Sequence, residues 1–168
     1  MALTPIKYPP RLDLARTPTP LQFLSRASEK WGAGKRLWMK RDDLTGAALT
    51  GNKIRKLEFI AAHALEHGFQ TLVTCGGVQS NHCRATALVA AQLGLDCHLV
   101  LRADDEPEQN TGNFLLDQLA GAAFEILPAK EWATQLKAIY ARLESEFAKA
   151  GRPALMIPTG GSDSLGVW

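Results

Sequence analysis

Residues 51–59 read GNKIRKLEF and place a lysine, Lys53, at the start of an amphipathic helix, directly after a Gly-Asn turn. Apolar residues recur at helical spacing as far as His67, and Gly68 is a credible stop. A second glycine turn, GGVQSN at residues 76–81, follows a short β-branched strand and opens another helix. The two turns therefore bring an amine and a set of free backbone N–H groups to the starts of two helices.

Helix and strand patterns alternate along the rest of the chain, joined by short links that contain glycine or proline. Such alternation predicts βαβ units, that is, an α/β fold with a parallel sheet flanked by helices on both faces. The expected helices cover residues 21–30, 53–67, 81–93, 113–119 and 131–150, and the expected strands cover residues 36–40, 71–75, 97–101, 124–127 and 155–157.

Composition argues for an ordinary globular protein: 168 residues, 46% hydrophobic, 21% charged and a net charge of +2. Lysine and arginine are spread along the chain, so no footprint for nucleic acid or lipid is expected. The first residues do not resemble a signal peptide, and no apolar run is long enough to span a membrane. Three cysteines without a C-x-x-C pair predict reduced thiols and no metal site, and we expect a cytoplasmic protein.

The lysine turn has two candidate amines. A lysine that forms an imine must be neutral, and burial, a nearby cation and a helix N-terminus all favour the neutral form. Lys53 stands where the helix begins, and Lys56 lies three residues on, on nearly the same face. The pattern does not decide which of the two lysines forms the imine. It also allows the alternative that both lysines only solvate the helix surface. With the second turn, it indicates chemistry on a small amino acid, with a lysine carrying an aldehyde cofactor.

The second glycine turn is an anion site in outline, because helix N-termini attract carboxylate or phosphate groups. Ser80 can exchange a proton in a hydrogen bond, and Asn81 can donate to a phenolate oxygen. Alternatively, both only cap the helix. His82 either contacts the ligand or packs in the first helical turn. The turn matches neither the Walker nor the Rossmann glycine pattern, so a nucleotide loop is not expected.

Two further features have alternative interpretations. Asp42 and Asp43 follow a strand, and we expect them to turn or cap the chain rather than act as an acid/base pair. The glycine loop at residues 160–166 either lines the same cleft or crosses between two domains. The apolar end at Val167 and Trp168 is typical of a cut chain, so we expect a longer protein.

The motifs GNKIRKLEF, GGVQSNH and GGSDSLG occur in the order and spacing of a known family. With PTPL at residues 18–21 and KRDD at residues 40–43, the chain resembles the D-cysteine desulfhydrase and 1-aminocyclopropane-1-carboxylate deaminase family. These are pyridoxal-phosphate enzymes with the tryptophan-synthase-β-like fold, fold type II. The resemblance covers nearly all of this chain but only the first half of the family's chain.

The resemblance implies a role for each motif residue. Lys53 would be the catalytic Schiff-base lysine that holds pyridoxal 5'-phosphate, and Asn81 would contact the O3′ oxygen of the cofactor. Ser80 would hold the substrate carboxylate and serve as nucleophile or proton carrier, with Gln79, Asn81 and His82 also binding substrate. His82 is more similar to the desulfhydrase branch than to the deaminase branch, where glutamine is common. The phosphate loop and the partner of the pyridine nitrogen would lie in the second half.

The resemblance also implies a domain plan: residues 1–52 join the large domain, residues 53–159 form the small α/β domain, and residues 160–168 begin the return into the large domain. The implied activity is α,β-elimination of D-cysteine to pyruvate, hydrogen sulfide and ammonia by a homodimer. The alternatives are deamination of 1-aminocyclopropane-1-carboxylate, or a truncated, non-catalytic α/β fragment. We expect the chain by itself to be inactive.

Overall fold

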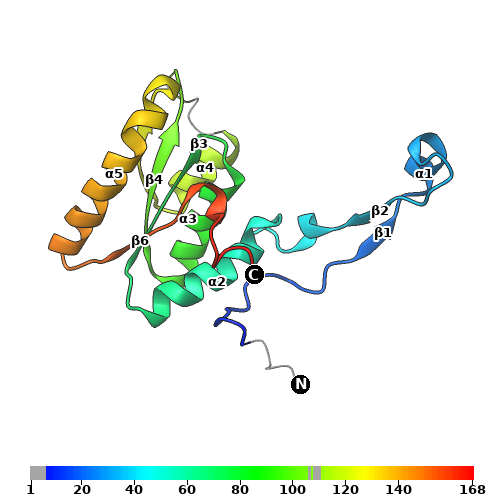
Figure 1. Cartoon of the computed structure of the whole chain (residues 1–168), viewed down its shortest axis with the longest axis horizontal. Helices are drawn as coiled ribbons and strands as arrows, with labels where there is room; N and C mark the ends of the chain where they lie inside the picture. The colour runs from blue at the N-terminus through cyan, green and yellow to red at the C-terminus, as the bar shows by residue number, and fades with distance from the viewer. Residues whose placement is uncertain (1–6, 106, 108–110) are drawn as a thin grey trace, which may run out of the picture.

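A computed structural model describes residues 7–105, 107 and 111–168, and its centre is a four-stranded parallel sheet in the order β5-β4-β3-β6. β3 (Thr71–Gly77) pairs with β4 (Asp96–Arg102) on one side and with β6 (Ala154–Met156) on the other, and β5 (Ala123–Leu127) pairs with β4. All four strands point the same way, so their carboxyl ends meet at one edge (Figure 1).

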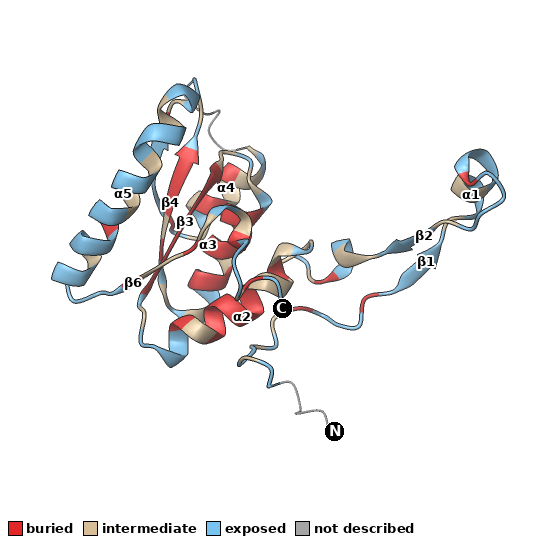
Figure 2. Ribbon diagram, viewed as in Figure 1, coloured by how far each residue is buried: buried red, intermediate tan, exposed pale blue. Residues whose placement is uncertain are grey.

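Helices cover both faces of this sheet, and its two central strands, β3 and β4, are largely buried (Figure 2). α2 (Lys53–Glu66), α3 (Asn81–Leu93) and α4 (Gly112–Leu119) pack on one face, and α5 (Ala129–Lys149) packs on the other. Successive strand residues point to opposite faces, so Leu72 joins the first core and Val73 the second. The α/β fold with a flanked parallel sheet is confirmed. No helix in the described ranges is long and apolar enough to cross a membrane.

The boundaries of the principal elements follow from local residue chemistry. α3 begins and ends at the predicted residues, with Ser80 as its N-cap and Gly94 at φ 70° as its C-cap. α2 ends one residue before its predicted end, and Gly68 takes the left-handed φ of 72° just beyond it. The remaining predicted strands and helices from residue 71 onward shift by at most two residues.

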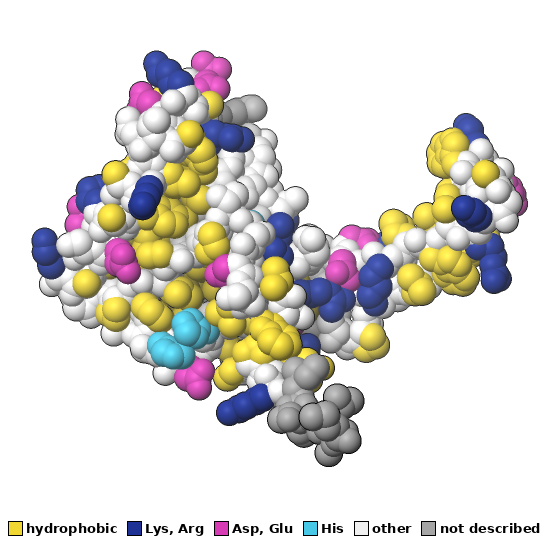
Figure 3. All heavy atoms as spheres, in the orientation of Figure 1, with side chains coloured by type: hydrophobic (Ala, Val, Ile, Leu, Met, Phe, Trp, Pro, Cys, Tyr) yellow, Lys and Arg dark blue, Asp and Glu magenta, His cyan; other side chains and the backbone are white. Residues whose placement is uncertain are grey.

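The prediction for residues 21–30 is partly wrong. Leu21–Phe23 form β1, which pairs antiparallel with β2 (Trp38–Lys40), and only Ser25–Trp31 form a helix, α1. Residues 21–23 form a strand rather than part of the helix because apolar side chains alternate at Leu21 and Phe23. The Phe23 ring also packs on the Trp38 ring of β2, with 5.1 Å between the ring centroids. This arm, residues 21–40, projects from the body and carries exposed apolar side chains (Figures 1 and 3).

Asp117 of α4 is a buried carboxyl group in the core between α3 and the sheet. It is 0% exposed, and neither carboxyl oxygen has a hydrogen-bond partner within the described ranges. Burial raises the pKa of Asp117 to about 7, against the opposing field of the Arg84 guanidinium. The carboxyl group therefore keeps its proton to a higher pH than an exposed aspartate does.

This burial predicts a pH-dependent stability. The folded pKa lies above the ordinary value of 3.8, so the protonated form stabilises the fold below about pH 4, and that stabilisation is lost as the pH rises through about 7. At about 1.4 kcal/mol per pKa unit, the change is on the order of 4 kcal/mol. Asp117→Asn, which cannot ionise, should gain stability relative to the parent between pH 5 and pH 8. Urea unfolding at several pH values measures this gain, and a difference that stays constant with pH would contradict it.

Candidate cofactor and substrate site

The site lies at the carboxyl edge of the sheet, where β3 runs into the second glycine turn and α3. The chain turns tightly here: a Cβ at Gly76 would lie 2.7 Å from Ser80 Oγ and 3.0 Å from Cys83 Sγ. Only glycine fits this position without displacing the start of α3. The turn therefore places the side chains of residues 79–82 at the N-terminus of a 13-residue helix.

Lys53 and Asn81, from two different helices, face the same hollow. Lys53 is the first residue of α2 and Asn81 the first of α3. The hollow has a volume of about 330 Å³, and its lining comprises Lys40, Asp42, Asp43, Thr50, Gly51, Asn52, Lys53, Asn81 and Arg84. A ligand bound there would meet an amine and an amide together.

The two candidate lysines differ in what they bind. Lys56 Nζ donates to Ser162 Oγ at 2.9 Å and to Gly161 O at 3.3 Å, so it is used to hold the third glycine loop. Lys53 Nζ makes no hydrogen bond or ion pair with the described residues. A Cβ at Gly160 would lie 3.6 Å from Lys53 Nζ, so the loop backbone approaches the amine. Of the two candidate amines, Lys53 is therefore the one that is not engaged by the described residues.

The third glycine loop lies beside the two helix starts. Gly160 and Gly161 have φ values of 68° and 57°, a conformation that favours glycine. A Cβ at Gly161 would lie 3.0 Å from His82 Cε1. The loop therefore lies beside Lys53 and His82, but the residues that line the hollow include none of residues 160–166. Whether it lines the site or crosses between two domains stays a prediction.

His82 is a buried imidazole beside that loop. It is 2% exposed, and neither ring nitrogen has a hydrogen-bond partner among the described residues. Burial, followed by the charges of Lys53 and Lys56, lowers the pKa of His82 to about 4, while Asp163 opposes the shift. The ring is therefore neutral near pH 7 and offers one donor and one acceptor nitrogen.

Ser80 caps α3, as one interpretation of the turn predicted. Its Oγ accepts hydrogen bonds from the backbone N–H groups of His82 and Cys83, each at 3.2 Å. Gln79 is exposed, and its Oε1 accepts a hydrogen bond from the backbone N–H of Asn113 at 2.7 Å. The cap does not conflict with a substrate role for Ser80, but it gives this residue a structural function as well.

The three cysteine thiols are buried, and burial raises the pKa of Cys97 above its ordinary value. Cys75, Cys83 and Cys97 are buried and unpaired, as the sequence predicted. Burial raises the pKa of Cys83 to about 12, so it remains a thiol at neutral pH even though it lies in the first turn of α3.

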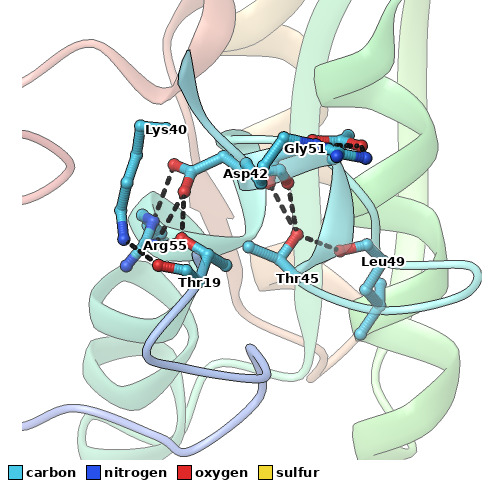
Figure 4. A network of polar contacts seen from close by, with 9 residues as sticks. Thr19, Lys40, Asp42, Thr45, Leu49, Gly51 and Arg55 are labelled. Carbon is cyan, nitrogen blue, oxygen red and sulfur yellow. Dashed lines mark hydrogen bonds and ion pairs between the residues drawn. The ribbon is translucent and has the colours of Figure 1, made fainter. Parts of the chain in front are cut away.

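Asp42 anchors the lysine turn to the N-terminal segment (Figure 4). Arg55 binds its carboxylate in a bidentate manner, at 2.8 Å from both Nε and Nη2, and Thr19 Oγ1 donates to it at 2.8 Å. The hydrogen bond from Arg55 lowers the pKa of Asp42 below its ordinary value. Asp43 pairs with Arg41 instead. The two carboxylates therefore hold the chain, as predicted.

Backbone contacts complete this anchor. The Asp42 carbonyl oxygen accepts hydrogen bonds from Gly51 N at 2.9 Å and from Thr45 Oγ1 at 2.9 Å. Thr45 is fully buried, and its Oγ1 also lies 3.0 Å from Gly51 O, so its one hydroxyl hydrogen is shared between these carbonyl oxygens. The small-residue loop before Lys53 is thus fixed by its own hydrogen bonds, and this fixes where α2 begins.

Sequence reasoning missed two polar residues of the site. Arg84 of α3 donates to Thr50 O at 2.8 Å and to Asn113 Oδ1 at 3.4 Å, which links α3 to the lysine loop and to α4. Asn113 bonds to the second glycine turn. The only local signal was the triplet TGN at residues 111–113, a turn followed by an amide at a helix start.

The family described as pyridoxal-phosphate dependent enzyme matches residues 12–167, and the chain belongs to it. A D-cysteine desulfhydrase of Serratia proteamaculans is 48% identical over 162 residues, which cover 94% of this chain and 47% of the relative. A bifunctional D-cysteine desulfhydrase/1-aminocyclopropane-1-carboxylate deaminase of Arabidopsis thaliana, named as mitochondrial, is 41% identical over 167 residues. The match covers 93% of this chain and 40% of that relative.

Solved structures agree on the fold. A crystal structure of an ACC deaminase homologue superposes with a TM-score of 0.83 at 40% identity, covering 94% of this chain and 47% of that one. An O-ureido-L-serine synthase, at 20% identity and a TM-score of 0.63, shows the fold alone. The architecture is that of fold type II pyridoxal-phosphate enzymes, and the chain spans about half the length of the relatives it matches.

The residues of the hollow fit pyridoxal phosphate, the cofactor of this family. An aldehyde needs an unengaged amine, and Lys53 provides one on the hollow, whereas Lys56 is engaged in two hydrogen bonds. A phenolate oxygen needs a donor, and Asn81 lines the same hollow. When bound, the cofactor supplies an electron sink for a carbanion next to the amino group.

Proposed function

We propose that the protein is a pyridoxal-phosphate-dependent lyase of the D-cysteine desulfhydrase type. The reaction would convert D-cysteine and water to pyruvate, hydrogen sulfide and ammonia. The observation that carries the proposal is the shared hollow of Lys53 and Asn81, in a chain 48% identical to about half of a D-cysteine desulfhydrase.

Each site residue of this chain would have a distinct role in the reaction. Lys53 would hold the cofactor covalently and, once displaced by the substrate amine, take the proton from the substrate Cα. The Asn81 amide would donate to the O3′ oxygen. The hydroxyl of Ser80, with Gln79 and the free N–H groups of the α3 start, would bind the substrate carboxylate. His82, neutral and buried against the third loop, would face the same substrate.

A second candidate is the deamination of 1-aminocyclopropane-1-carboxylate to 2-oxobutanoate and ammonia. It is favoured by the 41% identical bifunctional relative and by the structural neighbour described as an ACC deaminase homologue. We expect the full-length protein to release sulfide from D-cysteine at least tenfold faster than it forms 2-oxobutanoate. Paired assays with a sulfide reagent and with lactate dehydrogenase measure both rates, and faster 2-oxobutanoate formation would reverse the assignment.

The domain plan and assembly belong to the same proposal. We infer that residues 1–52 join a large domain, residues 53–159 form the small domain, and residues 160–168 begin the return. The exposed apolar side chains of the arm support this plan, because a large domain would cover them. The full-length form would be a cytoplasmic homodimer that binds a small amino acid. The 168-residue chain alone would hold the lysine and the carboxylate site but show no turnover.

A further inference from the structure

Asn113, the second residue of α4, ties that helix to the second glycine turn by three hydrogen bonds. Its backbone N–H donates to Gln79 Oε1 at 2.7 Å. Its side-chain Nδ2 donates to Gln79 O at 2.8 Å and to Asn81 Oδ1 at 2.9 Å. One side chain thus contacts both the turn and the amide that lines the hollow.

The chemistry of the partners fixes which way each amide points. The carbonyl oxygen of Gln79 can only accept, so the atom of Asn113 that faces it must be Nδ2. The guanidinium of Arg84 can only donate, and it contacts the other atom, Oδ1, at 3.4 Å. Each of the two Nδ2 hydrogens of Asn113 then has one acceptor.

Asn81 must therefore present its oxygen to Asn113. Its own Nδ2 has no hydrogen-bond partner within the described ranges, and Asn81 lines the hollow that Lys53 also lines. If the Asn81 amide were reversed, two N–H donors would face each other, and the hydrogen bond would be lost. The donor end of Asn81 is thereby left for a ligand.

The start of α4 is shaped for this contact. Gly112 has φ 55°, and a Cβ there would lie 2.3 Å from Gln79 Oε1. Any side chain at residue 112 would displace the Gln79 amide or strain the backbone. The TGN triplet thus combines a glycine that admits Gln79 with an asparagine that binds it.

We propose that Asn113 is a positioning residue that orients the Asn81 amide, so that Asn81 Nδ2 donates to an anionic oxygen of the molecule held by Lys53. The proposal rests on the proposed function. Asn113 is not among the residues that line the hollow, and its side-chain amide is engaged by Gln79, Asn81 and Arg84. Its effect passes through Asn81.

Asn113→Asp in the full-length protein tests the proposal. The carboxylate has no donor for Asn81, so the Asn81 amide should turn its Nδ2 toward the new charge and its oxygen toward the hollow. The dissociation constant for pyridoxal phosphate, measured by absorbance titration, should rise about tenfold. Asn113→Ala, which removes the donor without adding charge, should show a smaller rise. Gln92→Glu, an amide-to-acid change at an exposed position near the other end of α3, should leave the constant within twofold.

A double-mutant cycle separates action through Asn81 from a general effect. In an Asn81→Ala background, Asn113→Asp should change the dissociation constant by less than twofold. The positioning role would be overturned if Asn113→Asp raised the dissociation constant as much in the Asn81→Ala background as in the parent, or if the Asn113→Asp single variant stayed within twofold of the parent. A borohydride-fixed pyridoxyl label on Lys53 of the parent protein keeps the proposed function standing in either case, and its absence would overturn both.

Discussion

Lys53→Ala should abolish covalent capture of pyridoxal phosphate in the full-length protein. The parent, mixed with the cofactor and reduced with borohydride, should carry one stable pyridoxyl group per chain, and the variant should carry none at the site. The reason is geometric: Lys53 Nζ is unengaged at the hollow, whereas Lys56 Nζ is held by Ser162 and Gly161. Intact-mass spectrometry measures the label, and turnover should fall below detection.

Lys56→Ala is the matched control, since it removes an amine three residues away on the same helix. It should lose the two hydrogen bonds to the third glycine loop yet keep the label. Weaker substrate binding in this variant would not contradict the role of Lys53, because the third glycine loop would be held less firmly beside His82. A label that survives Lys53→Ala and disappears in Lys56→Ala would show that Lys56, not Lys53, binds the cofactor.

Ser80→Ala should reduce turnover far more than cofactor binding. Removing the hydroxyl takes away the proposed partner of the substrate carboxylate or its proton, and such groups typically contribute on the order of 100-fold or more. We expect kcat/KM to fall about 100-fold, while the dissociation constant for pyridoxal phosphate changes by less than about threefold. Steady-state kinetics and an absorbance titration give the two numbers.

The cap function of Ser80 requires its own control, because the loss of an N-cap costs about 1 kcal/mol of stability. Ser80→Asn keeps a good capping oxygen without the hydroxyl, and Ser80→Thr keeps both. We expect Ser80→Asn to be as inactive as Ser80→Ala, and Ser80→Thr to recover part of the activity. Full activity in Ser80→Asn would reduce the role of Ser80 to that of a cap.

The body of the fold could be predicted from periodicity and glycine stops. α2 and α3 carry apolar residues at helical spacing and stop shortly before Gly68 and Gly94, so their bounds were predictable within a residue. The arm was harder, because β1 has only three residues and gains its stability from pairing with β2, fifteen residues later. A short strand whose partner is unknown resembles the start of the helix that follows it.

The candidate site likewise contains residues that were predictable from the sequence and residues that were not. Lys53, Ser80 and Asn81 were visible because each stands at a helix start after a glycine turn. Asn113 and Arg84 were not, because their contacts span 29 to 34 positions and depend on how α4 packs against α3. Asp117 gave no signal either, since only the folded core shows that its carboxyl group lacks a partner.

Peptide mapping of the borohydride-reduced, pyridoxal-phosphate-saturated full-length protein tests the central claim most directly. A pyridoxyl group on Lys53 blocks tryptic cleavage there, so the account predicts the label on a peptide spanning residues 42–55. A label on the peptide spanning residues 56–84, on any other peptide, or on none would contradict it.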